Sequence, residues 1–177
     1  MDTSPLSKEA WITAALQRYQ RPLVHYALGI TGDIESARDV VQDTFLKLCV
    51  ADRASVDDHL AAWLYTVCRN RALNVRHKEA RSMEWDGKEA EARVVNDVSE
   101  AASRNEIHGR VLAVVGALPK EQQEAFHLKF RDGLNYREIS GVMGVSLGTV
   151  SNLITTALNR IRHELRSDLD LYHPQEV

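Results

Sequence analysis

The most strongly charged stretch of the chain is a basic run at residues 69–81, RNRALNVRHKEAR, in which five of thirteen residues are Arg or Lys and only Glu79 opposes them. Such a run neutralises nucleic-acid phosphates, which gives binding that weakens steeply with salt. Trp63 and Tyr65 lie just before it, and aromatic rings can stack on unpaired bases. The run therefore predicts a nucleic-acid surface on one helix. A solvated helix end, with Trp63 in the core, is the alternative interpretation.

A second pattern, LNYREISGVMGVSLGTVSNLI at residues 134–154, has the spacing of a helix-turn-helix. Its tight corner needs a small residue, a Gly that accepts positive φ, and apolar residues that lock the second helix onto the first. Residues of these types stand at the required positions: Ser140, Gly144, Val150 and Leu153. The alternative is a plain helical hairpin without a DNA-binding role.

The second helix of this motif would present a polar face to a major groove, and Ser146 would cap its first turn. The start of the helix suits a phosphate, and Asn152 can pair bidentately with adenine. The residues expected to contact DNA here are Gly148, Thr149, Ser151, Asn152, Thr155 and Arg160. An ordinary solvated face is the alternative.

The sequence contains no pattern that indicates catalysis. It has no HExxH, no Walker loop and no CxxC, and its seven His are scattered. The two Cys, Cys49 and Cys68, form neither a disulfide framework nor a zinc set and are expected to be buried thiols. We therefore expect no enzyme, no metal and no cofactor.

The elements that position these residues should all be helices, because Gly and Pro are scarce and apolar residues recur at helical spacing. A helix from about Pro5 to Arg21 should break or kink at Pro22, and a second should end near residues 29–32. Asp33 should then cap the next helix.

The helix after this cap should bury one stripe of side chains, because apolar residues recur every three or four positions. The expected stripe is Ile34, Ala37, Val41, Phe45 and Leu48. The polar segment 51–59 should be a loop, with Asp57 or Asp58 capping the long helix that contains the basic run.

The composition predicts two small helical domains joined by a flexible linker, an all-α fold with the helix-turn-helix in the second domain. Residues 5–82 form the first domain, residues 83–96 the linker, and residues 97–168 the second domain. Asp97 and Glu100 have capping-box spacing. An apolar stripe follows them at Ile107, Val111, Val114, Val115 and Leu118.

The net charge of −3 conceals opposed patches along the chain. Residues 69–81 carry +4 and residues 118–166 carry +2, whereas residues 84–106 carry −4. No apolar run approaches the ~18 residues that span a bilayer, and the N-terminus lacks a signal-peptide pattern. We expect a cytoplasmic protein without membrane insertion.

The order of these motifs resembles that of an extracytoplasmic-function (ECF) RNA polymerase sigma factor. ARDVVQDTFLKL at 37–48 resembles the helix that docks on the polymerase clamp, and AWLYTVCRNRALN at 62–74 resembles the helix that reads the −10 element. Residues 118–150 resemble the −35-reading domain. The resemblance implies a transcription initiation factor that binds core RNA polymerase and promoter DNA, with an anti-sigma factor as a further partner.

Residue roles follow from the resemblance position by position. The polymerase-binding residues would be Asp39, Gln42 and Asp43. The −10 contacts would be Arg69, Asn70, Asn74, Arg76 and Lys78. Segment 51–58 would hold a flipped-out base, and residues 147–156 would lie in the −35 major groove.

The chain departs from the family pattern in the helix-turn-helix domain. The stretch SNLITTALN carries no charge before Arg160, and Gln123 stands where a phosphate-binding Arg is common. We therefore expect a weak −35 contact. Two other functions stay open: a helix-turn-helix regulator that acts without polymerase docking, and a helical adaptor that binds only protein.

Overall fold

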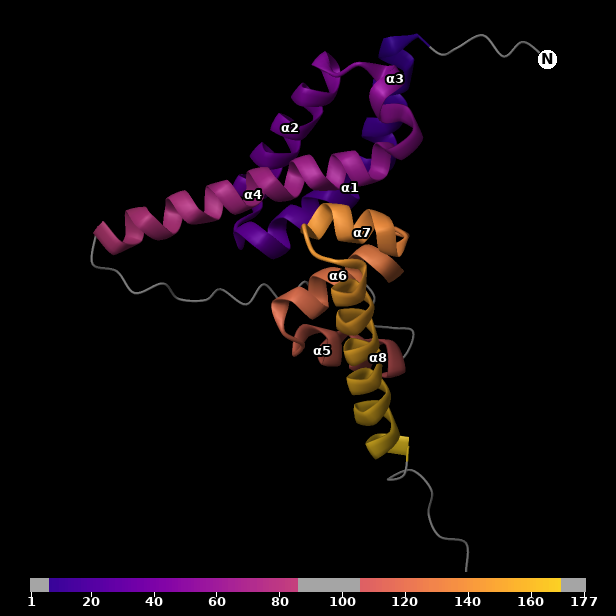
Figure 1. The fold of residues 1–177 in the computed structure, drawn as a ribbon. Coiled ribbons are helices and arrows are strands. Elements are labelled where there is room, and N and C mark those ends of the chain that lie inside the picture. Colours follow the sequence, from indigo (N-terminus) through magenta and orange to yellow (C-terminus); the bar gives the residue numbers. More distant parts are fainter. Residues whose placement is uncertain (1–6, 86–105, 170–177) are drawn as a thin grey trace, which may run out of the picture. The chain divides into compact units, whose positions relative to one another are not determined.

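The computed structural model describes residues 7–85 and 106–169, with side chains for residues 7–81 and 109–166, and every regular element in these ranges is a helix. The chain divides into two compact units, Met1–Val95 and Asn96–Val177. In Figure 1 the helices of the first unit run from indigo to magenta and those of the second from orange to yellow. The predicted all-α class with two helical units is confirmed.

The long helices of the first unit are α1 (Lys8–Thr31), α2 (Ile34–Val50) and α4 (Leu60–Trp85). The short helices α3 (Arg53–Val56) and η1 (Asp57–His59) connect α2 to α4. Helices α1 and α2 both pack against α4 and against each other (Figure 1). This arrangement exposes one face of α2 beside one face of α4.

The expected break at Pro22 is wrong, because α1 runs without interruption through Pro22 to Thr31. The alternative expectation of a kink there stays a prediction. Proline removes one helical hydrogen bond and costs about 3 kcal/mol in a helix interior. Burial of the next turns offsets this cost, since Leu23 and Ala27 are completely buried. The expected start at Pro5 lies outside the described residues. Within the described residues, α1 begins at Lys8.

Helix α2 begins as expected, with the Asp33 side chain accepting a hydrogen bond from the backbone N–H of Ser36. The expected stripe is buried apart from its first member: Ala37, Val41, Phe45 and Leu48 lie in the core, whereas Ile34 is 39% exposed. Ile34 occupies the first turn, where the neighbouring helices do not cover it.

The core of the first unit is filled by aliphatic side chains and one aromatic pair. Leu48, Leu64 and Cys68 are fully buried. Tyr26 and Tyr65 meet edge to face with ring centroids 5.1 Å apart. Burial raises the pKa of the Cys68 thiol to about 12. The prediction of a buried thiol is correct for Cys68.

The same prediction is wrong for the other cysteine. Cys49 is exposed in the last turn of α2, because its position falls off the buried stripe. Its neighbour Leu48 takes the buried position instead.

The second unit contains α5 (Glu106–Gly116), α6 (Lys120–Phe130), α7 (Tyr136–Met143) and α8 (Leu147–Leu169). The expected stripe is buried along its described part. Val115 and Leu118 join α8 residues in one cluster, with Val111 and Val114 packed against it. The side chain of Ile107 and the expected capping box at Asp97 and Glu100 lie outside the described residues.

Helices α7 and α8 form the predicted helix-turn-helix, with a bend of 105° between them. Gly144 ends α7 with φ of +69°, and Ser140 Oγ donates to the carbonyl of Val145 at 2.6 Å. Ser146 Oγ accepts from the backbone N–H of Thr149 and caps α8. Val150 is fully buried as expected.

Leu153 is only partly buried, and its neighbour Ile154 is the α8 residue that fills the core at this level. The start of α7 carries a full capping box between Asn135 and Glu138, which fixes where the first helix of the motif begins. The corner itself, between α7 and α8, is held by the Gly144 N–H, which donates to the Ser140 carbonyl, and by the Ser146 cap.

We expect Gly144→Ala to destabilise the second unit by about 1–2 kcal/mol, because an L residue is strained at positive φ. Gly141→Ala is the matched control, three residues earlier in the same helix. A Cβ there would meet open space, and Ala is the better helix former, so this change should stabilise by about 0.5–1 kcal/mol. Urea unfolding followed by circular dichroism measures both, and equal effects would contradict the assigned corner.

Helix α4 continues to Trp85, so residues 83–85 of the expected linker are helical. The linker and domain boundaries at 83, 96 and 97 otherwise stay predictions. Within the described ranges, no single helix is long and apolar enough to cross a membrane. Only α7 and α8 taken together, across their 105° bend, reach that length and composition.

Candidate nucleic-acid and polymerase interface

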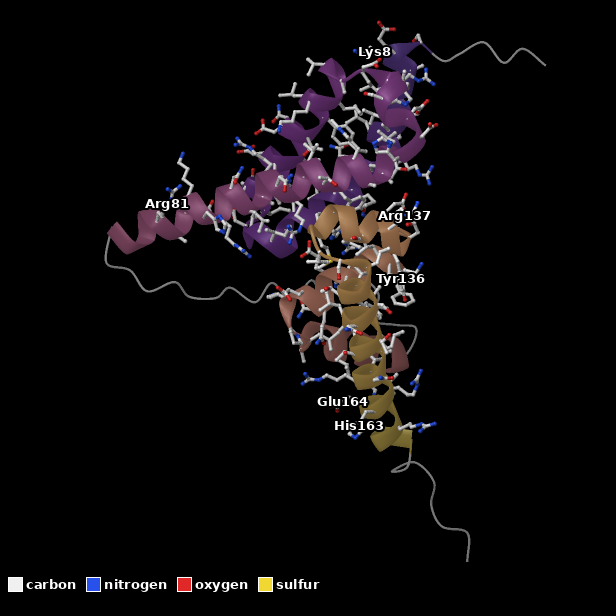
Figure 2. The ribbon with its side chains drawn as sticks, viewed as in Figure 1. Lys8, Arg81, Tyr136, Arg137, His163 and Glu164 are labelled. Atoms are coloured by element: carbon white, nitrogen blue, oxygen red, sulfur yellow. The ribbon has the colours of Figure 1, made fainter. Side chains whose placement is uncertain are left out.

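The basic part of α4 extends beyond the rest of its unit (Figure 1). Every side chain from Arg76 to Arg81 is exposed, and Arg81 is labelled near the end of this helix in Figure 2. A helix that is exposed on all sides over nearly two turns buries little apolar area there. Its basic residues are therefore presented for contact with another molecule.

The five residues expected to contact the −10 element do not share one face of α4. At 3.6 residues per turn, Asn70, Asn74 and Lys78 fall within a sector of about 80°. Arg69 and Arg76 lie on the other flank, about 180° and 160° from Lys78 respectively. Arg69 is also partly buried and has a partner within the protein. The structure thus places three of the predicted residues on one side of α4 and the other two on the opposite side.

The expected polymerase-binding residues do lie together on the outward face of α2. Asp39 and Gln42 are exposed and Asp43 is partly exposed. The same face continues into two apolar residues that the sequence reasoning missed. Leu46 is 57% exposed and Val50 is 83% exposed. The available signal was helical spacing, since Leu46 stands three residues after Asp43 and Val50 stands four residues after Leu46.

An ion pair joins the two faces, because Arg71 Nε on α4 donates to Asp43 Oδ2 on α2 at 2.7 Å. Arg71 was also missed, although it stands three residues before Asn74 and seven before Lys78. A groove of about 450 Å³ runs between the two helices beside this pair. Its lining residues are Asp43, Leu46, Lys47, Val50, Asn70, Arg71 and Asn74.

The segment expected to be a loop at 51–59 is instead the α3–η1 pair of short helices. Of the two expected caps of α4, Asp57 makes other contacts: its carboxylate accepts from Trp11 Nε1 at 2.8 Å and from Arg53 Nε at 3.2 Å. The cap by Asp58 stays a prediction. The Arg53 guanidinium also lies over the Trp11 ring. These contacts fasten the segment to the start of α1.

The two aromatic residues before the basic run differ in exposure. Tyr65 is 1% exposed and packed on Tyr26, so the expected stacking of Tyr65 on a base is excluded in this conformation. Trp63 is partly buried. Tyr65 therefore belongs to the core of the first unit, where it packs against α1.

Helix α8 presents the expected polar side to solvent at its N-terminal end. Gly148, Thr149, Asn152 and Thr155 are exposed, and Ser151 is partly buried. The exposed Arg160 lies eight residues after Asn152, roughly 12 Å further along the helix. The Thr149 N–H is already used by the Ser146 cap, which reduces its availability for a phosphate.

The Gln123 side chain makes its hydrogen bonds within the protein, at the turn between α5 and α6. Its Nε2 donates to the carbonyl oxygens of Gly116 and Leu118, each at 2.7 Å. Gln123, at a position where the sequence resemblance implies a phosphate contact, thus serves the fold in this chain. Among the described residues, no cluster of His, Cys, Asp and Glu could hold a metal ion.

The fold and its surfaces define a class: a two-unit helical protein with a helix-turn-helix and a separate basic helix. Residues 15–82 match the family described as Sigma-70 region 2, and residues 108–161 match Sigma-70, region 4. The chain is 32% identical over 137 residues to the ECF RNA polymerase sigma factor RpoE of Cereibacter sphaeroides, covering 74% of this chain and 71% of that protein.

Two other relatives agree. The ECF RNA polymerase sigma factor EcfG of Rhodopseudomonas palustris is 26% identical, covering 77% of this chain and 75% of that protein. The sigma factor RpoE of Bartonella quintana, solved in complex with the anti-sigma factor NepR, has the same fold. Its TM-score is 0.64 at 23% identity, covering 88% of this chain and 97% of that one.

The chain belongs to the ECF family of RNA polymerase sigma factors. It is accordingly a transcription initiation factor that binds core RNA polymerase and directs it to promoters. The resemblance seen in the order of the sequence motifs is confirmed.

Proposed function

We propose that the first unit binds polymerase through the outward face of α2 and the −10 element through the adjoining face of α4. The observation that carries this division is the groove between the two helices, which Asp43 and the pair Asn70 and Asn74 line together. The apolar residues Leu46 and Val50 would supply the desolvated centre of the polymerase contact. Asp39 and Gln42 would form its polar rim.

The −10 contacts would then come chiefly from Asn70, Asn74 and Lys78, which face the groove side of α4. Arg76, and Arg69 where its internal partner allows, would reach phosphates on the other flank. Charge on both flanks suits a strand that passes over the helix, because phosphate contacts hold position while the amide side chains face the bases. Segment 51–58, most of which lies in α3 and η1 and which is fastened through Trp11, would border the captured base.

The second unit would read the −35 element with the exposed side of α8, from Gly148 and Thr149 through Ser151, Asn152 and Thr155 to Arg160. This side carries no charge before Arg160. Its affinity for DNA alone should be low, since phosphate neutralisation supplies most non-specific binding. Polymerase would hold this helix against the promoter.

We expect Asn152→Ala to relax selectivity at one −35 base by about 1–2 kcal/mol, toward the lower end of the range for a bidentate pair. Competition between promoters that differ at single −35 positions measures this. Asn159→Ala, two turns further along the exposed side of α8, is the control and should change no single-base preference. Equal loss on every sequence would assign Asn152 to positioning rather than base readout.

Run-off transcription with core polymerase and a promoter library tests the whole proposal. We expect initiation that depends on the added protein and that falls when Leu46→Ser and Val50→Ser are combined. For the second unit, binding of protein alone is the competing role, favoured by the uncharged α8. That role predicts promoter selection that does not depend on the −35 element, whereas our proposal predicts that it does.

The chain would work in the cytoplasm without catalysis of its own, since polymerase carries out the chemistry. An anti-sigma factor would regulate it by covering the α2–α4 face. The solved Bartonella quintana relative supports regulation by such a partner, because its structure is a complex with an anti-sigma factor. Addition of a cognate anti-sigma factor should abolish run-off transcription, and retention of activity in a stable complex would contradict the proposal.

A further inference from the structure

The ion pair between Asp43 and Arg71 connects the two surfaces to which we assign different partners. The residues stand 28 positions apart in sequence, one on α2 and the other on α4, and meet at 2.7 Å. Both are reachable from outside, with 39% of the Asp43 side chain and 48% of the Arg71 side chain exposed. A group from another molecule that binds Asp43 must therefore compete with Arg71, and one that binds Arg71 must compete with Asp43.

Arg71 stands where a promoter strand would pass. It lines the groove with Asn70 and Asn74, and it lies about 20° from Lys78 around the α4 axis. Its guanidinium has the planar donor fork that suits a phosphate. In the present structure this fork is turned toward α2, because the Asp43 carboxylate holds it there.

We propose that Asp43 and Arg71 form a latch that couples polymerase docking to promoter binding; this inference rests on the function proposed above. In the free protein, Asp43 restrains Arg71. When polymerase docks on α2, a cationic side chain of polymerase takes over the Asp43 carboxylate. Arg71 is then released to bind a phosphate of the promoter strand in the groove. The protein thus gains one DNA contact only after it has bound polymerase.

The strength of the ion pair suits such an exchange. Ion pairs with this exposure favour the paired state over the separated state by no more than about five-fold. A polymerase cation or a DNA phosphate can replace one partner without leaving a buried charge alone, since both groups stay in contact with water. The latch should therefore change affinities by several-fold rather than by orders of magnitude.

The chain contains a matched control for this pair. Glu35 and Arg38 also form an ion pair, at 2.6 Å, but both belong to α2 and lie one turn apart. Substitutions in this second pair change the charge of the same unit by the same amount. They release no group toward the groove, so they report the general electrostatic effect alone.

The first test uses the free full-length protein and a labelled single-stranded oligonucleotide across a salt series. Asp43→Asn should tighten binding about five-fold and steepen the salt slope by about 0.7, the value for one added phosphate contact on a single strand. Glu35→Gln should change affinity less than two-fold. In the double variant Asp43→Asn with Arg71→Gln, the gain should disappear. A gain that matches Glu35→Gln, or that survives in the double variant, would overturn the latch.

The second test compares the free protein with the polymerase complex. In the polymerase complex, Arg71→Gln should weaken promoter binding about five-fold. In the free protein, the binding affinities of Arg71→Gln and of the control Arg38→Gln should differ by less than two-fold. An equal loss in both states would mean that Asp43 never restrained Arg71. Failure of the wild-type complex to initiate would instead refute the proposed function, and the first test would still decide the latch. Circular dichroism confirms that each variant keeps the native helix content.

Discussion

Ile154→Ala should lower the free energy of unfolding of the second unit by about 2–5 kcal/mol, the range for removing a large buried aliphatic side chain. Ile154 is 1% exposed on the face of α8 opposite the residues that would contact DNA. Its loss leaves a cavity in the core of the second unit. Promoter selection through the −35 element should fail with it, while polymerase binding through the first unit persists.

The three tryptophans allow the two units to be followed separately. Trp11, Trp63 and Trp85 all precede the second unit, so tryptophan fluorescence reports the first unit and circular dichroism reports both. We expect Ile154→Ala to move only the dichroism transition in urea. Thr156→Ala, exposed on the same helix, should change stability by less than about 0.5 kcal/mol. If the second unit of Ile154→Ala does not fold, Ile154→Val should show the same selective shift at about 0.5–1.5 kcal/mol.

Combined substitution of Arg76 and Lys78 by Ala should weaken promoter binding in the polymerase complex by about 1–3 kcal/mol and make its salt dependence shallower. Both side chains are exposed on the extended end of α4. Since they lie on opposite flanks, each should contact a different phosphate, and the two single effects should add.

The control for this pair is Arg18→Ala with Arg21→Ala, which removes two exposed positive charges from α1 in the same unit. We expect the control to leave the salt slope nearly unchanged. Fluorescence anisotropy of labelled promoter DNA with the reconstituted complex gives both quantities. An unchanged slope for the α4 variant would mean that the basic run is only a solvated helix end.

Local signals in the sequence were sufficient wherever the determining interactions lie within a few residues. The Asp33 cap, the αL conformation of Gly144 and the Ser146 cap were all predicted from residue type and spacing. Each depends on backbone geometry over one turn, which a short stretch of sequence encodes completely. The helical class followed in the same way from the periodicity of apolar residues.

Predictions failed where distant residues override a local tendency. Pro22 should break a helix, yet burial of Leu23 and Ala27 against other helices keeps α1 continuous. The polar segment 51–59 reads as a loop, but Trp11, more than forty positions away, binds Asp57 and holds the segment in helical turns. No window of sequence contains both partners of these contacts.

The sequence by itself determined the family, the helix-turn-helix and which helices carry acidic, basic and uncharged faces, because these properties follow from residue order along single helices. Only the tertiary structure decided which faces meet. Packing of α2 beside α4 brings Asp43 to Arg71 and creates the groove that joins the polymerase and promoter surfaces. That outcome depends on how the shared core sets the rotation of each helix about its axis, and rotation relative to a partner helix is a property of packing rather than of either segment alone.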